Sequence, residues 1–181
     1  MIALFLTECQ GGDEHATAKA LAELGFRKCF GSCAVLEHAP SGKPCFPTAP
    51  GIYVSISHSR GMCLAAIADC EIGADIERTA PYNERIQRVV GRFFAPDEAK
   101  SVKDGPDTEF YRLWCRKESY VKYTGEGFSR SFSSFSVLKL QESEGTPIFT
   151  DMNCAGFAIS VCADEKADTP PVFIKDLQIN N

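Results

Sequence analysis

The sequence lacks any stretch that could cross a membrane as a helix, because its apolar runs all fall well short of the roughly 18 residues that such a helix needs. The opening segment Met1–Leu6 is apolar, but it stops at Thr7 and has no basic residues before it, unlike a secretory signal peptide. Apolar residues make up 44% of the 181 positions and charged residues 24%, which is typical of a globular protein. We therefore expect a cytoplasmic globular protein with no membrane partner.

Metal-binding motifs built from cysteine and histidine are also lacking. The sequence has nine cysteines and three histidines, yet it contains no Cys-x-x-Cys pair and no histidine spacing typical of a zinc finger. An odd number of cysteines cannot all pair within one chain. Most of them lie in apolar runs, as Cys162 does within Ile159–Ala163, so we expect reduced, buried thiols.

An excess of basic charge is missing as well. The net charge is −5, although residues 78–130 carry 11 basic and 8 acidic side chains. Proteins that bind nucleic acids usually present a broad basic face, so we expect no nucleic-acid partner. The mildly basic middle of the chain is compatible with a smaller anionic ligand.

Strand patterns dominate the first part of the chain. Asp13–Leu24 has helical character, with Asp13 as its N-cap and Gly25 as its expected stop. The proline-rich stretch over residues 40–50 predicts an irregular connection, and the sequence Ser59-Arg60-Gly61 predicts a turn. The strands predicted here are Ile2–Thr7, Ser32–His38, Ile52–Ser57, Met62–Ala68 and Glu71–Glu77.

Helical patterns dominate the middle of the chain, and strands return in the last third. The predicted helices are Asn83–Arg92, Pro96–Lys103 and Thr108–Tyr123, the last of which is followed by Gly125 and Gly127. The predicted strands are Ser134–Leu140, Gly156–Ala163 and Val172–Leu177.

Each half of the sequence therefore combines a small antiparallel set of strands with helices. The strand ends at Ala66–Asp69 and Val161–Asp164 are similar, which permits a duplicated unit. We predict an α+β fold made of two similar halves, residues 1–77 and 78–181, that together form one structural unit.

Two carboxylates stand two residues apart in the segment Ile72–Glu77. Residues i and i+2 of a strand face the same side, so Asp75 and Glu77 would lie together while Ile76 faces the other way. Adjacent carboxylates repel each other unless a positive charge lies between them. A hard cation such as Mg²⁺ would supply that charge, whereas a solvated strand edge would need no ligand. Both interpretations are open at this point.

A third carboxylate lies in the helix predicted over Thr108–Tyr123. Glu118 shares a broad, otherwise apolar helix face with Trp114 and Val121. A carboxylate on such a face needs a charged or hydrogen-bonding partner. Lys122, four residues later, would provide an ordinary helical ion pair, and a metal ion or a phosphate would serve equally well.

The segment Val54–Ser59 contains Ser57 and His58 where a predicted strand enters a turn. Hydroxyl, imidazole and turn amide groups are good ligands for anions. A Ser–His hydrolase is not indicated, since the Gly-x-Ser-x-Gly turn between a strand and a helix is missing. A histidine that merely occupies a turn remains the simpler interpretation.

Taken together, these segments resemble the paired signature of the 4′-phosphopantetheinyl transferases. The signature consists of Gly73-Ala-Asp75-Ile-Glu77 and, further on, Trp114-Cys-Arg-Lys117-Glu118-Ser119-x-x-Lys122. Four more segments resemble the surfactin-type branch of this family: Gly42-Lys43-Pro44, Ser57-His58-Ser59, Arg92-Phe93-Phe94 and Gly125-Glu126-Gly127. The order of the segments agrees, and the match spans roughly residues 42–163.

The resemblance implies a pseudo-dimer of two similar α+β halves, with coenzyme A and Mg²⁺ in the cleft between them. It also implies transfer of the 4′-phosphopantetheine arm of coenzyme A to a serine of an apo acyl or peptidyl carrier protein, with release of 3′,5′-ADP. Asp75, Glu77 and Glu118 would bind the metal ion, and Glu118 or a water on that ion would take the serine proton. We expect Mn²⁺ to be accepted as well, because carboxylate ligands suit hard cations.

Coenzyme A itself would be held by five further residues, according to the resemblance. Lys122 would contact the pyrophosphate and take part in catalysis. Ser57 and His58 would hold phosphates, and Lys43 and Pro44 would line the nucleotide. The protein is expected to act as a monomer.

A basic helix face is expected to bind the carrier protein. Arg85, Arg88 and Arg92 recur at helical spacing, so they share one face. Carrier proteins are typically acidic around the modified serine, and opposite charge would steer their encounter.

The first part of the chain departs from the family pattern. Longer relatives have a larger N-terminal half with basic residues for the 3′-phosphate of coenzyme A, whereas only about 40 residues precede Gly42 here. The cations available there, none of which can be matched to the family, are His15, Lys19, Arg27 and Lys28. Two other functions therefore stay open: a coenzyme A- or carrier-binding module without turnover, and a Mg²⁺-dependent phosphodiester hydrolase.

Overall fold

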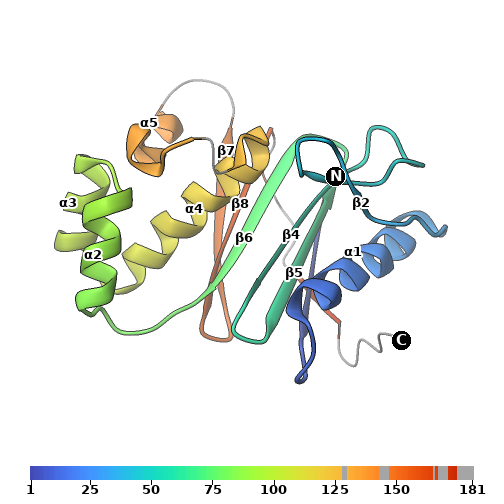
Figure 1. Ribbon diagram of the computed structural model, residues 1–181, viewed down its shortest axis with the longest axis horizontal. Helices are drawn as coiled ribbons and strands as arrows, with labels where there is room; N and C mark the ends of the chain where they lie inside the picture. Colours follow the sequence, from blue (N-terminus) through green and yellow to red (C-terminus); the bar gives the residue numbers. More distant parts are fainter. Residues whose placement is uncertain (128–129, 143–146, 165, 167–170, 175–181) are drawn as a thin grey trace.

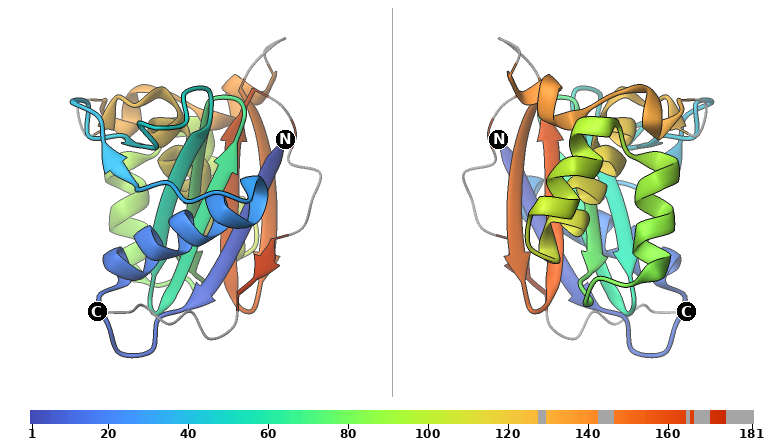
Figure 2. Two further views of the ribbon diagram at one scale, coloured as in Figure 1. Left: turned by 90° about the vertical axis from the view of Figure 1, so that its right-hand side faces the viewer. Right: turned by 90° about the vertical axis from the view of Figure 1, so that its left-hand side faces the viewer.

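The computed structural model describes residues 1–127, 130–142, 147–164, 166 and 171–174, and these form two β-sheets with helices on their outer faces (Figures 1 and 2). The larger sheet has the strand order β2-β3-β4-β5-β1-β9, and the smaller one has the order β6-β8-β7. The α+β class predicted from the sequence is therefore confirmed.

The larger sheet is covered by one helix, α1 (Glu14–Phe30). Its Asp13 side chain caps the helix by accepting hydrogen bonds from the backbone N–H groups of His15 and Ala16. Strand β5 pairs antiparallel with β1 and β4, and β9 runs parallel to β1. The strands of this sheet are β1 (Ile2–Glu8), β2 (Glu37–His38), β3 (Pro44–Cys45), β4 (Tyr53–Ser59), β5 (Met62–Ala68) and β9 (Val172–Phe173).

The smaller sheet is covered by α4 (Thr108–Thr124). The right-hand view of Figure 2 shows this helix together with the other helices on the same side of the molecule. The sheet consists of β6 (Ile72–Arg78), β7 (Ile148–Cys154) and β8 (Phe157–Ala163), all antiparallel. The remaining helical elements are α2 (Glu84–Phe93), α3 (Pro96–Asp104), the 3₁₀ turn η2 (Phe132–Ser134) and α5 (Val137–Glu142).

A hydrophobic core fills the space between the two sheets. It is built from Leu4 of β1, Leu64 of β5, Ile72 of β6 and Ile159 of β8, among others. Every residue of β5 is buried, because α1 covers its other face, and this explains why Met62–Ala68 is a continuous apolar run. Although they belong to different sheets, β4 and β6 lie side by side (Figure 1).

Helix α1 is longer than predicted, because Gly25 does not end it. The helix continues to Phe30 and ends at Gly31, which has a left-handed φ of 70°. A Cβ atom at Gly25 would lie 2.7 Å from the Phe5 ring, so glycine is needed there for close packing of the helix on the sheet. The predicted end of the helix at Gly25 is therefore wrong, because this glycine serves close packing inside α1.

The strand predicted over Ser134–Leu140 is wrong, since the structure places η2 and α5 there. The apolar alternation of this segment is overridden by tertiary hydrogen bonds. The Phe135 carbonyl accepts from the Lys117 ammonium at 2.8 Å, and the Val137 N–H donates to Glu98 at 2.8 Å. Glu98 and Lys117 also form a fully buried ion pair, so this segment is tied to α3 and α4.

Several other elements differ from their predicted bounds. Strand β7 was not predicted, because it is only partly buried and its sequence does not alternate regularly between apolar and polar residues. The strand predicted over Ser32–His38 shrinks to β2. Of Val172–Leu177, residues 172–173 form β9, while residues 175–177 lie outside the described residues.

All nine cysteines are free thiols. Among the described residues, no helix is long and apolar enough to span a membrane. Strand β6 runs one residue past the predicted division after residue 77 and pairs with β8 of the smaller sheet. The division into residues 1–77 and 78–181 stays a prediction.

Candidate active site

Strand β6 presents its two carboxylates on one side, as the alternation predicted. Asp75 and Glu77 face α4, whereas Ile76 is buried in the core between the sheets. Asp75 is only 4% exposed, so its charge needs nearby partners. Two such partners are the Ser57 hydroxyl and the Lys122 ammonium, each of which donates a hydrogen bond to Asp75 Oδ1 at 2.7 Å.

A glycine allows α4 to lie directly on β6. A Cβ atom at Gly73 would lie 1.9 Å from the Ser119 carbonyl oxygen and 2.4 Å from the Tyr123 nitrogen, both of which belong to the helix backbone. This close approach brings Glu118 and Lys122 over the strand. The Lys122 ammonium also donates to the Ala74 carbonyl at 3.1 Å.

Lys122 is therefore paired with Asp75, on another element, rather than held in a simple helical ion pair with Glu118. The Glu118 side chain is half-buried, on the same side of α4 as Lys122. Burial and the negative charge of Asp75 raise the pKa of Glu118 to about 7, while the positive charge of Lys122 opposes this rise. The pKa of Glu77 is also raised, mainly by burial, although hydrogen bonds from Ser59 and Trp114 counteract the shift.

Carboxylate oxygens of this kind are chemically suited to a hard divalent cation. Asp75 Oδ2 is buried and has no hydrogen-bond partner, which leaves one oxygen available as a ligand. The negative charges of Asp75 and Glu77 each raise the pKa of Glu118, so a cation near them would relieve the repulsion among the three carboxylates. In the described part of the chain no group of three ligands is already gathered as a metal cage, and Lys122 supplies the positive charge beside Asp75.

A cavity of about 530 Å³ opens beside these residues. It brings together four of the predicted site residues, although Ser57, His58, Asp75 and Glu77 are not in its lining. The four that line it are Lys43, Pro44, Glu118 and Lys122. Lys43 is held in place, because its ammonium contacts the Glu71 carboxylate and donates to the Tyr123 carbonyl at 2.9 Å.

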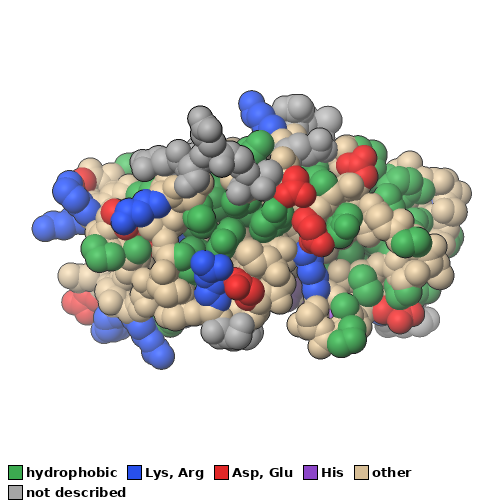
Figure 3. Space-filling model, turned by 90° about the horizontal axis from the view of Figure 1, so that it is seen from above, with side chains coloured by type: hydrophobic (Ala, Val, Ile, Leu, Met, Phe, Trp, Pro, Cys, Tyr) green, Lys and Arg blue, Asp and Glu red, His purple; other side chains and the backbone are tan. Residues whose placement is uncertain are grey.

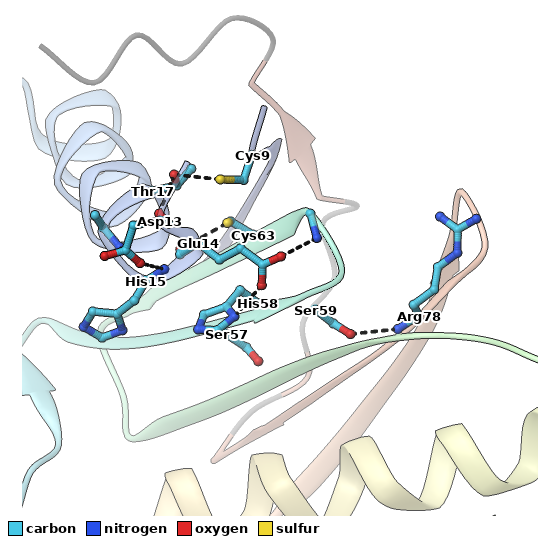
Figure 4. Close-up of polar contacts among 12 residues, drawn as sticks. Cys9, Asp13, Glu14, His15, Thr17, Ser57, His58, Ser59, Cys63 and Arg78 are labelled. Carbon is cyan, nitrogen blue, oxygen red and sulfur yellow. Dashed lines mark hydrogen bonds and ion pairs between the residues drawn. The ribbon is translucent and has the colours of Figure 1, made fainter. Parts of the chain in front are cut away.

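The three histidines of the chain gather at one edge of this cavity. The ring centroids of His15 and His38 are 6.2 Å apart, and those of His15 and His58 are 6.4 Å apart. His15 lines the cavity, and His58 Nδ1 contacts Glu14 Oε2 at 2.8 Å (Figure 4). The sequence motif points to His58, whereas His15 is recognisable from sequence only as an available cation, because nothing in the spacing shows that α1 and β2 bring the rings together.

Known proteins resemble this chain in the region of the site. Residues 71–172 match the model of the 4′-phosphopantetheinyl transferase superfamily. The chain belongs to this superfamily. It is 34% identical over 136 residues to the 4′-phosphopantetheinyl transferase Sfp of Bacillus subtilis strain 168, which covers 67% of this chain and 59% of the relative.

Two more distant 4′-phosphopantetheinyl transferases agree with this assignment. The identity is 31% over 116 residues to psf-1 of Bacillus pumilus, covering 62% of this chain and 48% of the relative. The identity to HetI of Nostoc is 33% over 85 residues, which cover 44% of this chain and 35% of the relative. The resemblance to the surfactin-type branch is thereby confirmed, while the chain spans 59% of the length of Sfp.

Proposed function

We propose that this superfamily member is a holo-carrier-protein synthase. It would transfer the 4′-phosphopantetheine arm of coenzyme A to a serine of an apo acyl or peptidyl carrier protein and release 3′,5′-ADP. The observation that supports the proposal is that Glu118 and Lys122 line one cavity while Lys122 also contacts Asp75, within the region that matches the superfamily.

In the proposed reaction the serine oxygen of the carrier protein attacks the β-phosphorus of coenzyme A. The bond from that phosphorus to the bridging oxygen breaks, and 3′,5′-ADP leaves with the bridging oxygen. Glu118 would take the serine proton as the general base. Lys122, at the same cavity, would balance the negative charge of the pyrophosphate.

Asp75, Glu77 and Glu118 would hold Mg²⁺ or Mn²⁺. When bound, such an ion neutralises charge that develops on the phosphate oxygens. Ser57 would keep Asp75 in place through the hydrogen bond between them. Because Lys122 already contacts Asp75, we expect its ammonium to move toward the pyrophosphate when both ligands bind.

Coenzyme A would lie along the cavity, with its nucleotide next to Lys43 and Pro44. Its 3′-phosphate would lie at the three histidines, because imidazole groups are good ligands for an anion. His58 keeps its proposed role next to the phosphates, whereas the single hydroxyl proton of Ser57 is already donated to Asp75.

The two sheets, each with its own covering helix, support the proposal of two similar halves. Central strand β5 pairs with two neighbours under α1, and central strand β8 does the same under α4. The cavity takes residues from both, since Lys43 and Val54 lie before β6 and Glu118 lies after it. A ligand bound there would contact both halves.

The test is mass spectrometry of an apo carrier protein incubated with coenzyme A, Mg²⁺ and this protein. Transfer adds the mass of one phosphopantetheine arm to the carrier. Release of 3′,5′-ADP without that gain would indicate a phosphodiester hydrolase. Binding of coenzyme A without either product would indicate a module without turnover.

A further inference from the structure

Three serines at alternate positions of β4 connect the two sheets. Ser55, Ser57 and Ser59 all contact β6, and each is at most 8% exposed. Within the described residues, β4 and β6 share no ladder of backbone hydrogen bonds. Side-chain hydroxyls therefore make the polar contacts along this line, which we call the serine seam.

The members of the serine seam differ in what they contact. Ser55 Oγ contacts backbone only: it accepts from the Ala74 N–H at 2.9 Å and donates to the Ala74 carbonyl at 3.4 Å. Ser59 Oγ donates to Glu77 Oε2 at 2.7 Å. It also accepts from the Arg78 N–H at 3.2 Å, the contact drawn in Figure 4. Ser55 thus joins two strands, whereas Ser59 also holds a carboxylate.

The Ser59 hydroxyl has a defined direction. A hydroxyl group has one proton, and because the Arg78 N–H points at its oxygen, that proton is directed to Glu77. A free glutamate side chain can rotate about three bonds. The hydrogen bond from Ser59 restricts this rotation and helps to fix where the carboxylate of Glu77 points.

We propose that Ser59 is a positioning residue that orients Glu77 for the divalent cation, while Ser55 only stabilises the serine seam. The proposal rests on the proposed function, in which Glu77 is a metal ligand. Groups that orient a metal ligand typically change metal affinity by about 10–100-fold when they are removed.

The experiment compares S59A with its matched control S55A and with S59T, which keeps the hydroxyl. Binding of Mn²⁺ is measured by the loss of the free-ion EPR signal in the presence of coenzyme A, and melting temperatures are measured without metal. We expect S59A to weaken Mn²⁺ binding by about 10-fold or more. S55A should lower the melting temperature but keep Mn²⁺ affinity within about two-fold of the wild type, and S59T should recover most of the affinity.

If the wild type binds Mn²⁺ normally, two results would overturn this proposal and leave the proposed function intact. One is an unchanged Mn²⁺ affinity in S59A, and the other is a loss of Mn²⁺ affinity in S55A equal to that in S59A. Absence of Mn²⁺ binding in the wild type would instead overturn the metal site of the proposed function, and this proposal with it. If S59A does not fold, S59T decides the question, because a wild-type affinity in S59T together with a loss in S59C again assigns the effect to the hydroxyl.

Discussion

At the scale of single residues, Glu118 is the group on which the proposed chemistry depends most. Glu118→Gln keeps the shape of the side chain and removes its ability to take a proton. We expect the rate of transfer at saturating Mg²⁺ to fall by at least about 100-fold, the usual scale for loss of a general base. The control is Glu8→Gln, which changes an exposed carboxylate at the end of β1. Near-normal turnover in the first variant would remove Glu118 from the site.

The raised pKa of Glu118 also predicts how the stability of the metal-free protein depends on pH. In the unfolded chain a glutamate has a pKa of about 4.3, whereas in the fold the pKa of Glu118 is about 7. Between these values the folded state binds more protons, so this group makes stability fall as pH rises and has no further effect above pH 7. Melting temperatures in EDTA should therefore decline less in E118Q than in the wild type over this range.

The histidines at the cavity edge predict discrimination between two ligands. Dephospho-coenzyme A lacks only the 3′-phosphate, so the wild type should bind coenzyme A more tightly than this analogue. In the double variant H15Q/H38Q we expect coenzyme A affinity to fall by about 10-fold, the scale of a charged hydrogen bond, with little change for the analogue. Lys28→Gln, in the last turn of α1, is the control. Calorimetry that shows equal losses for both ligands would exclude a 3′-phosphate contact.

Single residues also show how far the sequence predicts the site. Alternation in β6 is a local property, and it places Asp75 and Glu77 correctly on one side of the strand. The partner of Lys122 was not predictable, because Asp75 is 47 residues away along the chain and reaches the ammonium only through packing of α4 on β6. The same holds for the serine contacts, since the sequence does not reveal which strand lies next to β4.

At the scale of elements, the contact between α4 and β6 positions the site, and Gly73 permits it. Gly73→Ala would push a methyl group into the backbone of α4, so we expect a loss of at least about 1–3 kcal/mol in the free energy of unfolding. Transfer should be lost together with stability, because Glu118 and Lys122 move with the helix.

The matched control is Gly91→Ala in α2, where a Cβ atom would meet nothing within 4 Å. In an exposed helix position this change should stabilise the protein by up to about 1 kcal/mol. Urea denaturation of both variants checks the pair. Equal unfolding free energies for G73A and the wild type would mean that the helix can move away from the strand without loss.

Elements were predicted best where one local pattern decides their type. The helix over Thr108–Tyr123 and the strand Met62–Ala68 are long or uniformly apolar, and both agree with the structure to within a residue. The strand predicted over Ser134–Leu140 failed because Lys117 and Glu98, from two other helices, capture its backbone. Such contacts are decided by tertiary structure, to which a periodicity analysis has no access.

At the scale of the whole molecule, the distribution of charge predicts where a carrier protein docks. Arg85, Arg88 and Arg92 are all exposed on α2, and Lys and Arg side chains gather at the end of the molecule that holds α2 and α3 (Figure 3). Arg85→Glu with Arg88→Glu should raise KM for the carrier protein by about 10-fold or more at low salt and leave KM for coenzyme A unchanged. An unchanged carrier KM and an unchanged salt dependence would place the docking surface elsewhere.

The pairing of segments that are far apart in the sequence has a consequence for folding during synthesis on the ribosome. Phe5 pairs with Val172, and Ile72 pairs with Ala163, so both sheets need strands that are synthesised late. While the nascent chain still lacks α4 and β8, β6 is an open edge that exposes apolar side chains and two acidic groups to any passing strand. The site is therefore among the last parts of the molecule to form, and a transferase activity would report that synthesis and folding had both been completed.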